Sequence, residues 1–60
     1  MTERAIRSLI KENDISWSLF NSAHGKIFLF RYEHGQLVLD EMEVRNTVSR
    51  ITNERKLKTS

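Results

Sequence analysis

The stretch ISWSLFNSA, residues 15–23, decides the fold of this 60-residue chain because it suits two secondary structures. In its first half, apolar residues alternate with serines, which is the period of two typical of a half-buried strand. Ser16 is also a good cap for a helix that begins at Trp17. The strand is the preferred interpretation, and the helix is the alternative.

On the strand interpretation, a three-stranded antiparallel sheet follows. NSAHG, residues 21–25, forms the first turn, and KIFLFRYE, residues 26–33, forms the second strand. His34 and Gly35 suit a two-residue hairpin loop, because Gly adopts positive φ freely and His does so more readily than most residues. QLVLD, residues 36–40, then forms the third strand and leads into a helix.

Helices are predicted on both sides of this sheet. Residues 2–13 carry an apolar stripe at helical spacing, with a threonine as the cap and turn-favouring residues at the end. Residues 40–56 begin with Asp40 and have Glu43 three positions later, as in a capping box. The tail, residues 57–60, is expected to fray. The predicted fold class is therefore α+β, in the order α-β-β-β-α, with all 60 residues in one small domain.

The short chain and its apolar pattern together predict a contact surface. A domain of this size buries only about 60% of the surface that its unfolded chain exposes. The sequence has no Cys, which excludes disulfides, and its two His residues do not have a zinc-binding spacing. Two helices cover only one face of the predicted sheet, so we expect a second copy of the chain, or another protein, to cover the other face. The residues predicted on this apolar sheet face are Phe20, Ile27, Leu29, Arg31 and Val38.

The charges are distributed unevenly around a net charge of +2. Residues 1–43 hold five basic and seven acidic groups, whereas residues 44–60 hold five basic groups and one acidic group. A basic C-terminal helix is suited to contact phosphates or an acidic protein surface, and it also complements the helix dipole. The candidate nucleic-acid-binding residues are Arg45, Arg50, Arg55, Lys56 and Lys58.

The remaining sequence features indicate a non-enzymatic, cytoplasmic regulatory protein. No apolar run reaches the roughly 20 residues needed to span a bilayer, and the N-terminal segment has too many charges for a signal peptide. Ser16 and Ser18 lack a glycine-flanked nucleophile elbow, and no glycine-rich phosphate loop is present. We therefore predict no catalytic residue, cofactor, metal or small-molecule substrate. The expected state is a homodimer with a macromolecular partner, a protein in preference to nucleic acid.

The helical alternative rests on a resemblance. LIKENDISWSLFNSAHGK, residues 9–26, resembles a helix-turn-helix, and KIFLFRYEHGQLVLDEMEV, residues 26–44, resembles the winged hairpin and third helix that follow it in excisionase-like and MerR-like domains. This resemblance implies a DNA-binding regulator of transcription or recombination. The chain departs from the pattern in having Asp14 at the usual turn glycine, Asn13 at a usual apolar position, and no Arg or Lys in residues 17–23.

Two weaker alternatives concern the middle of the chain. SAHGKIF, residues 22–28, is loosely similar to the strand start of small toxin ribonucleases, which implies a general base at His24. Alternating aromatic residues between Lys26 and Arg31 are also compatible with stacking on single-stranded nucleic acid.

Overall fold

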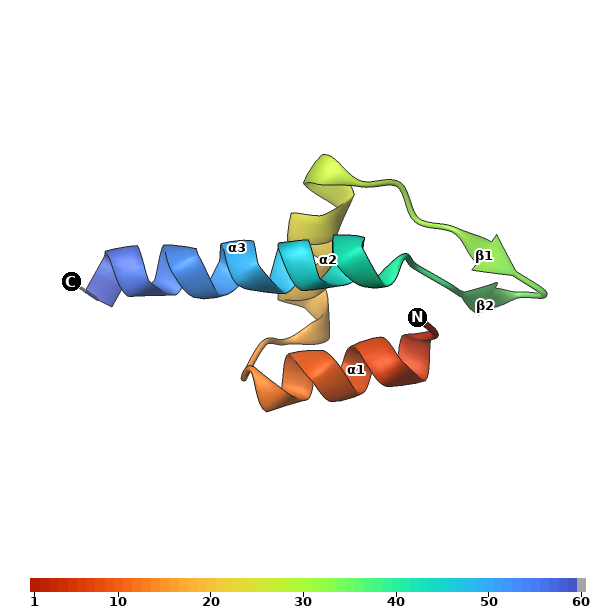
Figure 1. The fold of residues 1–60 in the computed structure, drawn as a ribbon, viewed down its shortest axis with the longest axis horizontal. Coiled ribbons are helices and arrows are strands. Elements are labelled where there is room, and N and C mark those ends of the chain that lie inside the picture. The colour runs from red at the N-terminus through yellow and green to blue at the C-terminus, as the bar shows by residue number, and fades with distance from the viewer. Residues whose placement is uncertain (60) are drawn as a thin grey trace.

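The computed structural model describes the backbone of residues 1–59 and the side chains of residues 1–57. The protein is a small α+β fold in which a two-stranded antiparallel sheet lies between helices in the chain order (Figure 1). The elements are α1 (Glu3–Glu12), α2 (Trp17–Ile27), β1 (Tyr32–Glu33), β2 (Gln36–Leu37) and α3 (Glu41–Thr59).

The segment predicted as the first strand is helical, so the three-stranded sheet was a wrong prediction. Ser16 caps α2, since its Oγ accepts a hydrogen bond from the backbone N–H of Leu19 (3.1 Å). The helix buries Phe20 completely and leaves Leu19 41% exposed, the reverse of the burial that strand alternation predicts. The predicted turn at residues 21–25 is the second half of the same helix, and only Tyr32–Glu33 of the predicted second strand pairs as a strand.

The N-terminal helix was predicted correctly. The Thr2 side chain accepts from the backbone N–H of Ala5 (3.4 Å) and caps α1. Ile6 and Ile10 are buried on its inner face, and the helix ends at Asn13. Of the other residues in the predicted apolar stripe, Leu9 is half-buried against the core and Ala5 is exposed.

A four-residue turn, residues 13–16, joins α1 to α2. Asp14 has a φ of 55°, in the left-handed region that the short polar side chains of Asp and Asn tolerate better than most. Ile15 is buried, and its backbone N–H donates to the Ile10 carbonyl (2.8 Å). Asp14 thus takes the conformation that a turn glycine usually takes, and Ile15 supplies the apolar contact that Asn13 does not.

The predicted hairpin loop is confirmed. His34 and Gly35 have φ values of 52° and 76°, and two positive φ values are what a type I′ turn requires. The strands pair Tyr32 with Leu37 and Glu33 with Gln36. The hairpin projects at the end of the molecule opposite to the C-terminal end of α3 (Figure 1).

The last helix begins as predicted and runs further than predicted. Asp40 accepts from the backbone N–H of Met42 (2.9 Å), and α3 continues to Thr59, so the predicted end at residue 56 was early. Ser60 of the predicted frayed tail lies outside the described residues. α2 packs against both α1 and α3, and the core is enclosed between these helices and the hairpin (Figure 1). The buried apolar residues are Ile6, Ile10, Ile15, Phe20, Leu37, Leu39, Val44, Val48 and Ile51.

Candidate nucleic-acid interface

The inner face of α2 fixes how this helix is turned. Phe20 stacks between Trp17 and His24, with ring centroids 5.8 Å and 5.2 Å away. Phe20 and His24 are both completely buried, and residues four apart lie on the same face of a helix. The opposite face of α2 is therefore directed away from the core.

The outer face of α2 is made of small and basic residues. Ser18, Ser22, Gly25 and Lys26 are all exposed, at the i, i+4, i+7, i+8 spacing of one helix face. α2 also contains no acidic residue. Small side chains let another surface approach the backbone closely. We call these four residues the outer face of α2. Ser22 and Lys26 also border a hollow that Arg50 and Glu54 of α3 line, so a cation and a carboxylate of α3 lie beside this face.

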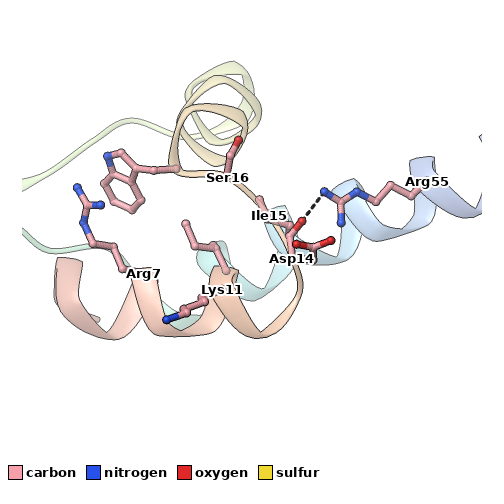
Figure 2. A pocket seen from close by; sticks show the side chains of 8 residues that line it. Arg7, Lys11, Asp14, Ile15, Ser16 and Arg55 are labelled. Atoms are coloured by element: carbon pink, nitrogen blue, oxygen red, sulfur yellow. Dashed lines mark hydrogen bonds between the residues drawn. The ribbon is translucent and has the colours of Figure 1, made fainter.

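A basic hollow lies beside the start of α2. It encloses about 530 Å³ around the turn between α1 and α2, and three of its lining side chains are cationic: Arg7 and Lys11 from α1 and Arg55 from α3 (Figure 2). Asp14 is the acidic residue in its lining, and Ser16 lines it as the α2 cap. We call this site the turn hollow. Its three cations and one carboxylate give it a net positive charge, which suits an anionic group.

Two of the three cations are held in place by neighbours. The Arg7 guanidinium lies 4.3 Å from the centroid of the Trp17 ring and also pairs with Glu3 (3.1 Å). Arg55 donates to the backbone carbonyls of Asn13 (3.1 Å) and Asp14 (2.7 Å). The second of these contacts joins α3 directly to the turn and orients Arg55 toward the hollow (Figure 2).

His24 is the most constrained polar residue of α2. Its Nδ1 lies 2.9 Å from Thr47 Oγ1 on α3, and the Thr47 hydroxyl donates to the Glu43 carbonyl (3.0 Å). Because Thr47 has a single hydroxyl proton, its oxygen accepts from His24 Nδ1–H, and Nε2 is the bare nitrogen of the ring. Burial lowers the pKa of the His24 imidazole below the usual histidine value, and the Glu43 carboxylate opposes that shift.

The apolar sheet face predicted from the sequence is not formed. Phe20 lies in the core on α2, and Ile27 at the end of α2 is half-buried, as is Val38 after β2. Leu29 is 85% exposed, and Arg31 pairs with Glu43 (3.4 Å). These residues come from α2, from the segment between α2 and β1, and from the position after β2, so they do not share one sheet face. The homodimer stays a prediction.

The basic residues predicted on the last helix do not lie along one face. Arg45, Arg50 and Arg55 are five residues apart, which turns each about 140° around the helix from the one before. Arg45 pairs with Glu41 (3.1 Å), and Lys56 is exposed. The side chain of Lys58 lies outside the described residues. Of this set, Arg55 joins the turn hollow.

Sequence reasoning missed Arg7, Lys11 and the buried state of His24. The signal for the first two was present, because cations four residues apart on α1 lie on one helix face. His24 was interpreted as a turn residue, whereas it is buried among phenylalanine rings and therefore has no open path to a substrate.

Other classes of site are not visible in the part of the chain that the structure describes. Among side chains 1–57, no group of three or more His, Cys, Asp or Glu residues is arranged to hold a metal ion. None of the helices within residues 1–59 has the length and apolar character that crossing a bilayer requires. No family model, curated protein or solved structure matches the chain.

Proposed function

We propose that this chain is a non-enzymatic regulatory protein that binds duplex DNA as a winged helix-turn-helix domain. The observation that carries the proposal is the order of α1, a four-residue turn, α2, hairpin and α3, combined with an outer face of α2 that bears no carboxylate. A helix-turn-helix joins two steeply crossed helices by a turn of three or four residues, and its second helix enters the major groove. Figure 1 shows α2 crossing the direction of α1.

The outer face of α2 has the chemistry for reading bases. The hydroxyls of Ser18 and Ser22 each donate and accept hydrogen bonds, so they suit either partner on a base edge. The Phe30 ring packs against Gly25, 3.3 Å from the position that a Cβ would take, and Lys26 adds a cation to the exposed face. We therefore assign discrimination between DNA sequences to α2. The hairpin is the wing, and we assign to it contact with the neighbouring DNA backbone.

The turn hollow has the chemistry for holding backbone phosphate. Phosphate contacts fix the position of a protein on the duplex, while base contacts give specificity. Arg7, Lys11 and Arg55 come from two helices and line the hollow beside the start of α2, which is the end of a recognition helix that meets the duplex. We therefore assign orientation on the DNA to these three cations.

Salt dependence tests this assignment. Three phosphate contacts predict that log K falls with log salt at a slope of about −3, and Lys11→Ala should bring the slope to about −2, because each contact contributes roughly 0.9. Fluorescence anisotropy of a labelled duplex, measured from low to physiological salt, gives both slopes. Lys11 is exposed on α1 and alanine is the best helix former, so the fold should be unchanged.

Arg45→Ala is the matched control for Lys11→Ala. It removes the same charge from an exposed position whose guanidinium already pairs with Glu41 and lies outside the turn hollow. The slope should remain that of the wild type. Equal slopes for the two variants would show that binding reflects net charge alone, and absence of duplex binding at low salt would leave a protein as the partner.

A further inference from the structure

His24 has a buried nitrogen with no partner. The ring is completely buried, Nδ1 donates to Thr47, and Nε2 has no hydrogen-bond partner within the described residues. Three phenylalanine rings surround it, with centroids 5.2 Å, 5.2 Å and 5.4 Å from the His24 centroid. These rings belong to Phe20, Phe28 and Phe30.

The charged surroundings of His24 are simple. Glu43 on α3 is the carboxylate that acts on the imidazole, and Arg31, from the segment between α2 and β1, pairs with that carboxylate at 3.4 Å. The three phenylalanine rings and the Thr47 hydroxyl also lie against the imidazole, and they carry no charge. Glu43 is therefore partly neutralised by its own partner and is a weak stabiliser of a positive charge on His24.

Protonation of His24 conflicts with this environment. The proton must enter at Nε2, because Nδ1 already carries the hydrogen that Thr47 accepts. The new N–H would point among phenylalanine rings, whose faces attract a cation but do not supply a hydrogen-bond acceptor of carbonyl strength. The neutral ring is compatible with the packing of α2 on α3, and the charged ring is not.

We propose that His24 is a proton-sensitive latch between α2 and α3, so that mild acid releases α2 from the core. Release would also remove the outer face of α2 from its DNA-binding position, and this consequence alone rests on the proposed function. The latch itself is a property of the free protein.

The direction of the pH effect follows from the lowered pKa of folded His24. In the unfolded chain, His24 has the ordinary histidine value of about 6.5, so below this pH the unfolded state binds more protons. The stabilising contribution is complete above pH 6.5 and is lost as the pH falls toward the folded pKa. Between the folded and unfolded pKa values, the unfolding equilibrium constant should rise up to tenfold for each unit by which the pH falls.

NMR of the wild-type protein tests the latch without any variant. The ring signals of His24 are followed from pH 8 to pH 5. We expect the His24 ring to remain neutral below the ordinary histidine pKa of about 6.5, until the folded signals are lost. Titration of His24 at or above about pH 6.5, with the fold retained, would overturn the proposal.

Urea titrations at pH 7.5 and pH 5.5 give the second measure. The wild type should be less stable at the lower pH, and His34→Asn should behave in the same way, because Asn tolerates the positive φ of that position. The stability of His24→Leu should differ little between the two pH values, because leucine cannot be protonated. The same pH dependence in His24→Leu and wild type would contradict the latch. Because these experiments contain no DNA, their outcome is independent of whether the chain binds a duplex.

Discussion

Phe20→Ala is expected to prevent the chain from folding. Phe20 is completely buried in the first half of α2, between Trp17 and His24. Truncating a buried phenylalanine typically costs about 3–5 kcal/mol, and a core of this size rarely supplies more than about 3–5 kcal/mol in total. Circular dichroism of Phe20→Ala at 25 °C should show loss of most of the helical signal and no cooperative urea transition.

Leu19→Ala is the control for this prediction, and it also separates the two interpretations of residues 15–23. Leu19 is 41% exposed, so its truncation should leave a folded protein with a small loss of stability. A strand would place Leu19 in the core and Phe20 on the outside. Leu19→Ala would then lose more stability than Phe20→Ala. A folded Phe20→Ala together with an unfolded Leu19→Ala would contradict the helix.

The elements that could be predicted from the sequence are those with local signals. The caps at Thr2 and Asp40 and the hairpin loop at residues 34–35 all depend on conformations or hydrogen bonds within a few residues. Such signals are contained in the sequence itself, because each residue type has its own conformational preference. They identified α1, the hairpin turn and the start of α3.

The middle of the chain was misjudged because α2 has a core face that is not purely apolar. Trp17, Phe20 and His24 lie at helical spacing, but an imidazole counts as polar in any hydrophobic pattern. Gly25 also disfavours a helix interior. The alternation around Ser16 and Ser18 was therefore the clearer signal, although it reflects a helix cap and an exposed face. Tertiary packing of His24 against three aromatic rings outweighed both local penalties.

The candidate site was less predictable than the fold for a physical reason. Lys11 and Arg55 are far apart in sequence, and they line one hollow only because Arg55 of α3 reaches the turn that follows α1. The sequence indicated a basic C-terminal helix, but the roughly 140° rotation between successive arginines disperses their charges. Only a three-dimensional arrangement shows which of them joins the cations of α1.

Ser22→Glu is expected to reduce duplex binding at least tenfold while leaving the fold intact. Ser22 is exposed in the middle of the outer face of α2, and glutamate is a good helix former. In the proposed complex, the new carboxylate would face base edges and phosphates, losing a hydrogen-bonding hydroxyl and adding charge repulsion. Loss of one good base contact costs about 1–3 kcal/mol, and about 1.4 kcal/mol corresponds to tenfold in affinity.

Ser49→Glu provides the matched control, because it makes the same chemical change at an exposed position of α3. Both variants should retain the urea stability of the wild type within about 0.5 kcal/mol, as surface substitutions usually do. Anisotropy with a labelled duplex at fixed salt should then show a large loss for Ser22→Glu and a small one for Ser49→Glu. Equal losses would remove α2 from the interface.

The central claim is that α2 reads duplex DNA, and selection from a pool of random-sequence duplexes tests it most directly. The wild-type protein is incubated with the pool at physiological salt, retained DNA is sequenced over successive rounds, and a single-stranded pool is run beside it. We predict enrichment of a shared duplex sequence by the wild type and no such enrichment by Ser22→Glu. Failure to enrich any sequence, or stronger retention of single strands than of duplexes, would contradict the claim.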